Sequence, residues 1–152
     1  MFLVTHSAVA LLATRWTNNP AIAFGVGLLS HFVMDALPHG DEGLVYAIRR
    51  DRRREIAWFT LVMIIDLLLL GLGFAWMVTH AGFRLAEAFA IAGACLPDFM
   101  WGFEKVIGRR VFGLFSVFHD RCHNVKKIVI PSWYGLPLQL ALAAGLWYLL
   151  GR

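Results

Sequence analysis

Apolar residues fill five stretches of this chain, and polar or helix-breaking residues separate them. The apolar stretches run over residues 2–14, 20–37, 56–79, 85–104 and 132–150, with a more polar stretch near 110–124. Loop-forming residues fall at their ends, since Asn18-Asn19-Pro20 starts the second stretch and Pro38-His39-Gly40 ends it. The pattern therefore predicts an all-α chain of about five long apolar helices and one shorter, more polar helix.

The lengths of these stretches suit a lipid bilayer, because a helix needs about 20 apolar residues to cross the hydrocarbon core. The composition agrees: 59% of the 152 residues are hydrophobic, 16% are charged, and the mean hydropathy is +0.66. Soluble domains have about a quarter of their residues charged. We expect one domain over residues 1–152, a polytopic integral membrane helical bundle, in which the first apolar stretch is short for a full span.

Basic residues mark the expected orientation. Arg49, Arg50 and Arg52–Arg54 crowd one loop, while Lys105, Arg109, Arg110, Lys126 and Lys127 flank another. The positive-inside rule makes both loops and the N-terminus cytoplasmic, as in a bacterial inner membrane protein. We expect these loops to contact anionic lipid head groups. Nucleic-acid binding is not expected, since no basic face is interleaved with exposed aromatic residues.

Two further features limit the class of protein. No Lys or Arg precedes residues 2–13 and no clean small-residue cleavage site follows them, so we do not expect a cleaved signal peptide. The two cysteines, Cys95 and Cys122, make no disulfide framework and are expected to be free thiols.

Ionisable residues within the apolar pattern are the main candidates for function. Because successive helices alternate in direction, eight of these residues come to the cytoplasmic leaflet: His6, His31, Asp35, His39, Asp66, Asp98, His119 and His123. Each would cost about 2.5 to 3.5 kcal/mol at the centre of a membrane helix, which makes such residues rare and functional by default. Taken alone, His6 could be a packing residue, and Asp66 could cap a backbone break.

The spacing of these residues favours a metal site. His31 and Asp35 stand four residues apart, as do His119 and His123, so each pair shares one helix face. Imidazole and carboxylate groups together suit a divalent ion, with Zn²⁺ or Mn²⁺ our first choices. The candidates outnumber the ligands of one ion, so we expect one or two ions per chain, the latter bridged by a carboxylate.

Four short motifs carry a resemblance to a known family: "THS", "SHFVMDALPHG", "LPDFMWG" and "FHDRCH". Together they resemble the membrane-bound, predicted metal-dependent hydrolases of the LexA-regulated YdjM type. The resemblance covers His6, His31 with Asp35, Asp98 after Pro97, and His119 with His123. The chain departs from that family in three ways: its Pro-Asp motif lacks a second Asp, that motif follows the His-x-x-x-Asp motif, and the His-Arg segment is shorter, with Arg121 displaced by one position. The resemblance implies a hydrolase and leaves the substrate open.

A metal-dependent hydrolase that cleaves a lipid phosphoester at the cytoplasmic leaflet is the function that we expect. Its substrate would be a phospholipid or an isoprenoid phosphate, with Arg121 binding the phosphate and Asp120 acting as a general base. The main alternative is a small divalent-metal or proton-coupled transporter, which would use the same His and Asp residues. A structural protein with a metal staple is a third alternative. The sequence leaves open whether the chain acts alone or as a homo-oligomer.

Overall fold

The described part of the chain folds into α-helices. The computed structural model describes residues 1–40, 52–123, 125 and 130–152, and this part of the chain contains helices and no strands. The helices are α1 (Leu3–Ala13), α2 (Pro20–Asp35), α4 (Arg52–Ala81), α5 (Leu85–Ile107), α6 (Leu114–His123) and α7 (Ser132–Leu150). Each predicted stretch corresponds to one of these helices, so the all-α prediction is confirmed. Arg49, Arg50, Lys126 and Lys127 lie outside the described residues.

Local sequence signals fix where several helices begin and end. The Asn19 side chain accepts hydrogen bonds from the backbone of Ala21 and Ile22, and Pro20 occupies the first helical position of α2. At the start of α5, the Glu87 carboxylate accepts the Arg84 backbone N–H at 2.9 Å, which is one half of a capping box. These caps satisfy backbone donors that the first turn of a helix leaves without partners.

Helices α2 and α5 pack with their backbones in direct contact. A Cβ atom at Gly27 of α2 would overlap the carbonyl oxygen of Ala90, and one at Gly93 of α5 would overlap the carbonyl oxygen of Phe24. Small residues continue this seam at Ala23 of α2, which is buried. Small residues let helix backbones approach closely, and interfaces of this kind are common between membrane helices. The seam brings the end of α2 against the middle of α5.

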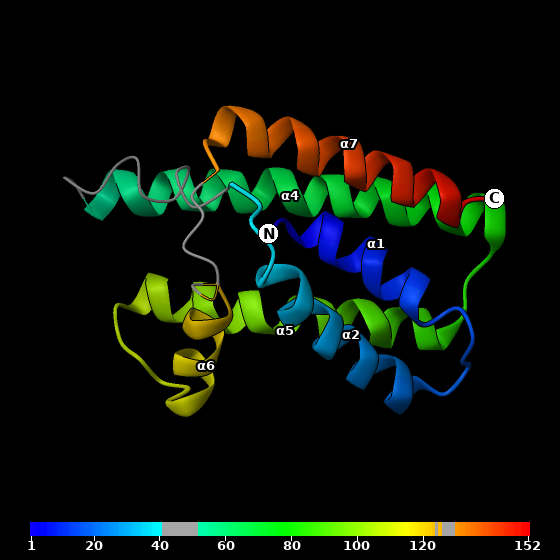
Figure 1. Ribbon diagram of the computed structural model, residues 1–152, viewed down its shortest axis with the longest axis horizontal. Coiled ribbons are helices and arrows are strands. Elements are labelled where there is room, and N and C mark those ends of the chain that lie inside the picture. The colour runs from blue at the N-terminus through cyan, green and yellow to red at the C-terminus, as the bar shows by residue number, and fades with distance from the viewer. Residues whose placement is uncertain (41–51, 124, 126–129) are drawn as a thin grey trace.

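Helix α1 lies between two pairs of helices, with α2 and α5 on one side and α4 and α7 on the other (Figure 1). Most of its residues are buried, including Leu3, Ala8 and Leu11. The indole of Trp147 on α7 donates a hydrogen bond to the carbonyl of Val4 at 3.0 Å. This central position explains why a short apolar helix contributes so much of the core.

Two of the described helices, α4 and α7, are long and apolar enough to cross a membrane by length and composition. The predicted set of about five spans is therefore reached only in part. Helix α1 has 11 residues and α2 has 16, which at 1.5 Å per residue gives about 16 and 24 Å, shorter than a hydrocarbon core of about 30 Å. Helix α5 has 23 residues but carries charged side chains at both ends and Asp98 between them.

Apolar side chains cover much of the outer surface of the bundle. On α4, Leu68 is 63% exposed and Leu72 is 68% exposed, and large apolar residues of α2 and α7 are also exposed. Contiguous exposed apolar surface commonly marks a face that interacts with a membrane or another protein. It is the surface that a bilayer or a further protein would cover.

Candidate metal centre

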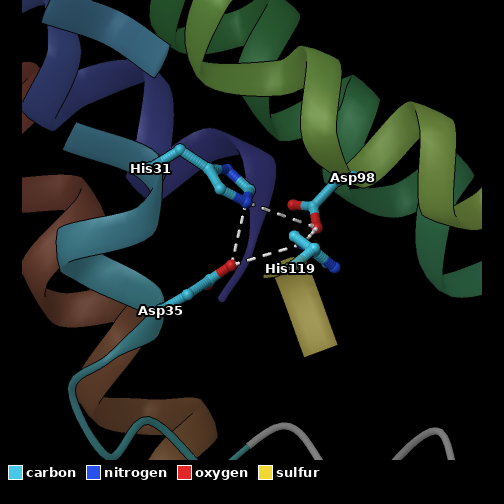
Figure 2. A group of neighbouring side chains, drawn as sticks. All are labelled: His31, Asp35, Asp98 and His119. Carbon is cyan, nitrogen blue, oxygen red and sulfur yellow. Dashed lines mark ion pairs between the residues drawn. The ribbon is translucent and has the colours of Figure 1, made fainter. Parts of the chain in front are cut away.

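Four side chains from three helices converge at one point (Figure 2). His31 and Asp35 come from the last turns of α2, Asp98 from α5 and His119 from α6. Each offers one ligand atom, and these four atoms lie within 4.8 Å of one another. Ligands that bind one ion at about 2.1 Å lie about 3 to 4 Å apart, so the separation suits a shared cation.

Asp35 also belongs to a second group of ligands. Its carboxylate, His39 and His123 offer three atoms that again lie within 4.8 Å of one another. The Nε2 atom of His123 lies 2.9 Å from Asp35 Oδ2, and the Nε2 atom of His31 lies 2.8 Å from the same oxygen. One carboxylate is therefore common to both groups, as a bridging ligand between two ions would be.

His6 also contacts the carboxylates of Asp35 and Asp98, through the oxygen of each that does not face His31. Its Nε2 atom lies 3.1 Å from Asp35 Oδ1 and 3.9 Å from Asp98 Oδ2. Its ring stacks on that of His31, with the ring centroids 4.2 Å apart. The amino nitrogen of Met1 lies 3.0 Å from Asp35 Oδ1 as well. The structure thus brings His6 into the cluster, although it belongs to neither of the two ligand groups.

Several polar atoms of the cluster are buried and have no hydrogen-bond partner among the described residues. The Nε2 atoms of His6, His31 and His119 make no hydrogen bond to any described residue. The nitrogens of His6 and His31 nevertheless lie 3.1 and 2.8 Å from oxygens of Asp35. Buried polar groups are normally satisfied. Atoms that face a common point without bonding each other have the arrangement of ligands around a cation.

A backbone carbonyl sets the tautomer of His31. The Nδ1 atom of His31 lies 2.7 Å from the carbonyl oxygen of Ala94 on α5, and only the N–H form of Nδ1 can donate to it. The Nε2 atom then carries the lone pair that faces Asp35 and Asp98. Metal-binding histidines commonly donate their second nitrogen in this way. Sequence spacing could not reveal this partner, because a backbone carbonyl carries no residue-specific signal.

One side of the cluster is open. The side chain of Asp98 is 15% exposed and that of His123 is 24% exposed, whereas those of His6, His31 and Asp35 are fully buried. A catalytic ion keeps a coordination position for water or substrate, and a purely structural ion does not. The exposed edge between α5 and α6 is the side from which such a molecule would enter.

Asp66 has a different set of partners from the one that the sequence suggested. Its Oδ2 atom accepts the Leu3 backbone N–H at 2.6 Å, and its Oδ1 atom accepts that of Val4 at 3.0 Å. Both oxygens are thus occupied by the first turn of α1, and Asp66 is in neither ligand group. A carboxylate at this position satisfies two backbone donors and interacts favourably with the helix dipole.

We expect Asp66→Asn to weaken the fold without removing the ion. The amide nitrogen cannot accept a hydrogen bond, so one buried backbone N–H at the start of α1 loses its partner, at a cost of about 1 to 2 kcal/mol. Thermal unfolding in detergent and metal content per chain are the two measurements. Asn19→Ala, which removes the cap of α2, is the matched control. Loss of metal without loss of stability would show that Asp66 is a ligand.

The two residues predicted to act in catalysis lie outside the cluster. Asp120 Oδ2 accepts a hydrogen bond from Arg110 at 2.7 Å, near the protein surface. Arg121 is exposed and stands two residues from both His119 and His123, which places it on the opposite face of α6. The structure therefore brings neither residue together with the predicted ligands.

Both cysteines are free, as the sequence predicted. Cys95 is buried and its sulfur lies 3.3 Å from the hydroxyl of Ser7. Cys122 is partly buried on α6, and burial, together with the negative charge of Asp35, raises the pKa of its thiol. A thiol that stays protonated is a poor metal ligand.

Comparisons of the chain with models of protein families, with curated proteins and with solved structures found no significant match. The case for any function therefore depends on the residues and their geometry.

Proposed function

We propose that the chain is a membrane-embedded, metal-dependent hydrolase that cleaves a phosphoester of a lipid, either a phospholipid or an isoprenoid phosphate. The observation that carries the proposal is the pair of ligand groups that share Asp35 and have an open edge at Asp98 and His123. Histidine and carboxylate ligands in this number suit Zn²⁺ or Mn²⁺, one or two per chain. Bound there, such an ion would lower the pKa of a bound water and polarise a phosphoryl group.

The chain's own residues have distinct roles in this proposal. His6, His31, His119 and His123 surround the Asp35 carboxylate, and the last three of them belong to the two ligand groups. Asp98, which is partly exposed at the open edge, is the group best placed to accept a proton from an attacking water. Asp120 and Arg121 lie on the outer side of α6, where Arg121 is suited to contact anionic head groups instead of reacting atoms.

The membrane part of the proposal assigns all five apolar helices to the bilayer, with the N-terminus and α6 on the cytoplasmic side. The exposed apolar residues of α2, α4 and α7 support it. The close α2 and α5 seam at Gly27 and Gly93 also supports it. The start of α1 and the end of α2 would then both lie at the metal centre, in the cytoplasmic leaflet. A lipid could approach this centre sideways through the open edge.

Packing beside the metal centre weakens the case for a transporter. Small apolar side chains take up much of the space between α1, α2 and α5, with Ala8, Ala23 and Ala90 fully buried. The hydroxyl of Ser7 in this region contacts the sulfur of Cys95. A transport path from the cluster to the other leaflet would need polar groups or water along this route. A metal staple would close the coordination shell, whereas Asp98 and His123 remain partly exposed.

The first test is metal content and lipid hydrolysis by protein purified in detergent. We expect one to two equivalents of Zn or Mn per chain by elemental mass spectrometry, and release of phosphate or a phosphorylated head group from lipid substrates. His123→Ala should lower both. The matched control is His80→Ala, since His80 lies at the far end of α4 with its Nδ1 2.8 Å from the Trp76 carbonyl.

Three outcomes separate the candidate functions. Folded, metal-free protein that resists reconstitution would contradict any metal function. Bound metal with ion flux into proteoliposomes and no hydrolysis would favour the transporter. Tight metal with neither flux nor hydrolysis of any lipid phosphoester would favour the structural staple.

A further inference from the structure

Helix α6 supplies two of the clustered histidines, yet it is one of the smallest elements of the fold. It has 10 residues, and both His119 and His123 lie in its second half. A helix of this length is marginal by itself, so its position depends on contacts at its ends. The contact at its start is made by Glu104, a residue for which the sequence pattern suggested no role.

A single carboxylate oxygen of Glu104 holds the start of α6. Its Oε1 atom accepts the backbone N–H groups of Val111 at 2.6 Å and Phe112 at 2.7 Å, and the hydroxyl of Ser116 at 2.9 Å. Glu104 is 8% exposed and Ser116 is 5% exposed. The hydrogen bond from Ser116 is therefore buried, and the two from the backbone are partly buried. Hydrogen bonds to an ionised acceptor are roughly twice as strong as neutral ones.

On α6, the residue that contacts Glu104 lies close in sequence to the two histidines of the cluster. Ser116, His119 and His123 follow at intervals of three and four residues, so they share one face of α6. Glu104 lies six residues after Asp98 on α5, about 9 Å further along that helix. Two points thus orient α6 on α5, the Glu104 contact at Ser116 and the ligand cluster at His119.

We propose that Glu104 is a positioning residue. It docks α6 on α5, so that His119 and His123 are in position before the ion binds. This inference rests on the proposed function in one respect, that the cluster binds metal. Docking by Glu104 does not itself require the ion. Without Glu104, α6 is held by the packing of Phe115 and Phe118 on Phe32 of α2 and by the ion. Part of the free energy of metal binding then goes into ordering α6, which lowers the metal affinity.

The variant Glu104→Ala should lower the affinity for Co²⁺ or Zn²⁺ by about tenfold to a hundredfold, as loss of an outer-shell partner does. The visible spectrum of bound Co²⁺ should shift towards that of a variant lacking both His119 and His123. Glu104→Gln should rescue affinity and spectrum, because its amide oxygen can still accept from this donor set. Glu87→Ala, at the opposite end of α5, controls for general destabilisation.

Hydrogen exchange on metal-free protein provides an independent measurement. In Glu104→Ala, the amides of residues 111–123 should exchange at least tenfold faster than in the parent, while those of α1 and α2 should not change. Ser116→Ala, which removes one of the three hydrogen bonds, should give a smaller effect in the same region.

The outcomes separate this inference from the proposed function. A metal-free parent would contradict the metal centre, and exchange in residues 111–123 would still test the docking role. A metal-binding parent whose affinity, Co²⁺ spectrum and exchange are unchanged in Glu104→Ala would overturn the inference alone. If Glu104→Ala does not fold, the other two variants decide. The inference would be overturned if hydrogen exchange is unchanged in both Ser116→Ala and Glu104→Gln while the Glu104→Gln protein no longer binds metal.

Discussion

Asp35→Ala is expected to abolish metal binding at both ligand groups. Asp35 is the one residue that the two groups share, and its two oxygens lie 2.8 to 3.6 Å from the Nε2 atoms of four histidines: His6, His31, His119 and His123. Without it, each group loses its bridging carboxylate, and the second group retains only two histidines. Loss of an outer-shell partner alone costs about tenfold to a hundredfold in affinity, so loss of this ligand should cost more than about a hundredfold.

Competition titration with a chelating dye and elemental analysis would measure this loss. Asp120→Ala is the matched control, because Asp120 is also an aspartate close to the cluster in sequence but is bound by Arg110 near the surface. It should leave metal content unchanged. The assignment of the metal centre would be wrong if Asp35→Ala kept the parent's metal content, or if Asp120→Ala lost it while remaining folded.

Gly27→Ala is expected to disrupt the fold and the metal centre together. The added methyl group would overlap the carbonyl oxygen of Ala90, which is backbone and cannot rotate away. Helix α2 would have to move away from α5, and His31 would move away from the Ala94 carbonyl that it contacts at 2.7 Å. Overpacking of a tight interface costs about 1 to 3 kcal/mol, and contact with backbone places this site at the upper end.

The neighbouring glycine provides a close control. A Cβ atom at Gly25, on the same helix, would meet no atom within 4 Å, so Gly25→Ala should leave stability equal or slightly higher. Thermal unfolding should show Gly27→Ala several degrees below the parent, with reduced metal content. Equal melting temperatures for Gly25→Ala and Gly27→Ala would contradict the described packing of α2 on α5.

The sequence predicted the helices well because their signals are local. Apolar runs, the Asn19-Pro20 start of α2 and the proline before α7 depend on neighbouring residues only. The His31 and Asp35 pair, and the His119 and His123 pair, are also local, because a separation of four residues places two side chains on one helix face. The predicted number of full membrane spans was reached only in part, since α1 and α2 are shorter than their apolar runs.

Long-range contacts decided which polar residues belong to the cluster. Asp66 and Asp98 are both aspartates within apolar helices, and the helix pattern alone does not show which of them lies beside the histidines. The structure places Asp98 beside His119 and places Asp66 under the first turn of α1, where it accepts two backbone hydrogen bonds. Glu104 stands at the end of a helix like any solvated charge, but it accepts three hydrogen bonds from the start of α6.

By itself, the sequence determined an all-helical, strongly apolar chain and the two ligand pairs that lie on single helix faces. The tertiary structure decided that Asp35 is the common centre, that Asp66 is a cap and that Asp120 and Arg121 face outwards. The physical reason is that the period of a helix fixes directions within one helix. The relative positions of α2, α5 and α6 depend on where backbones can touch, at Gly27 and Gly93, and on a carboxylate that docks a short helix.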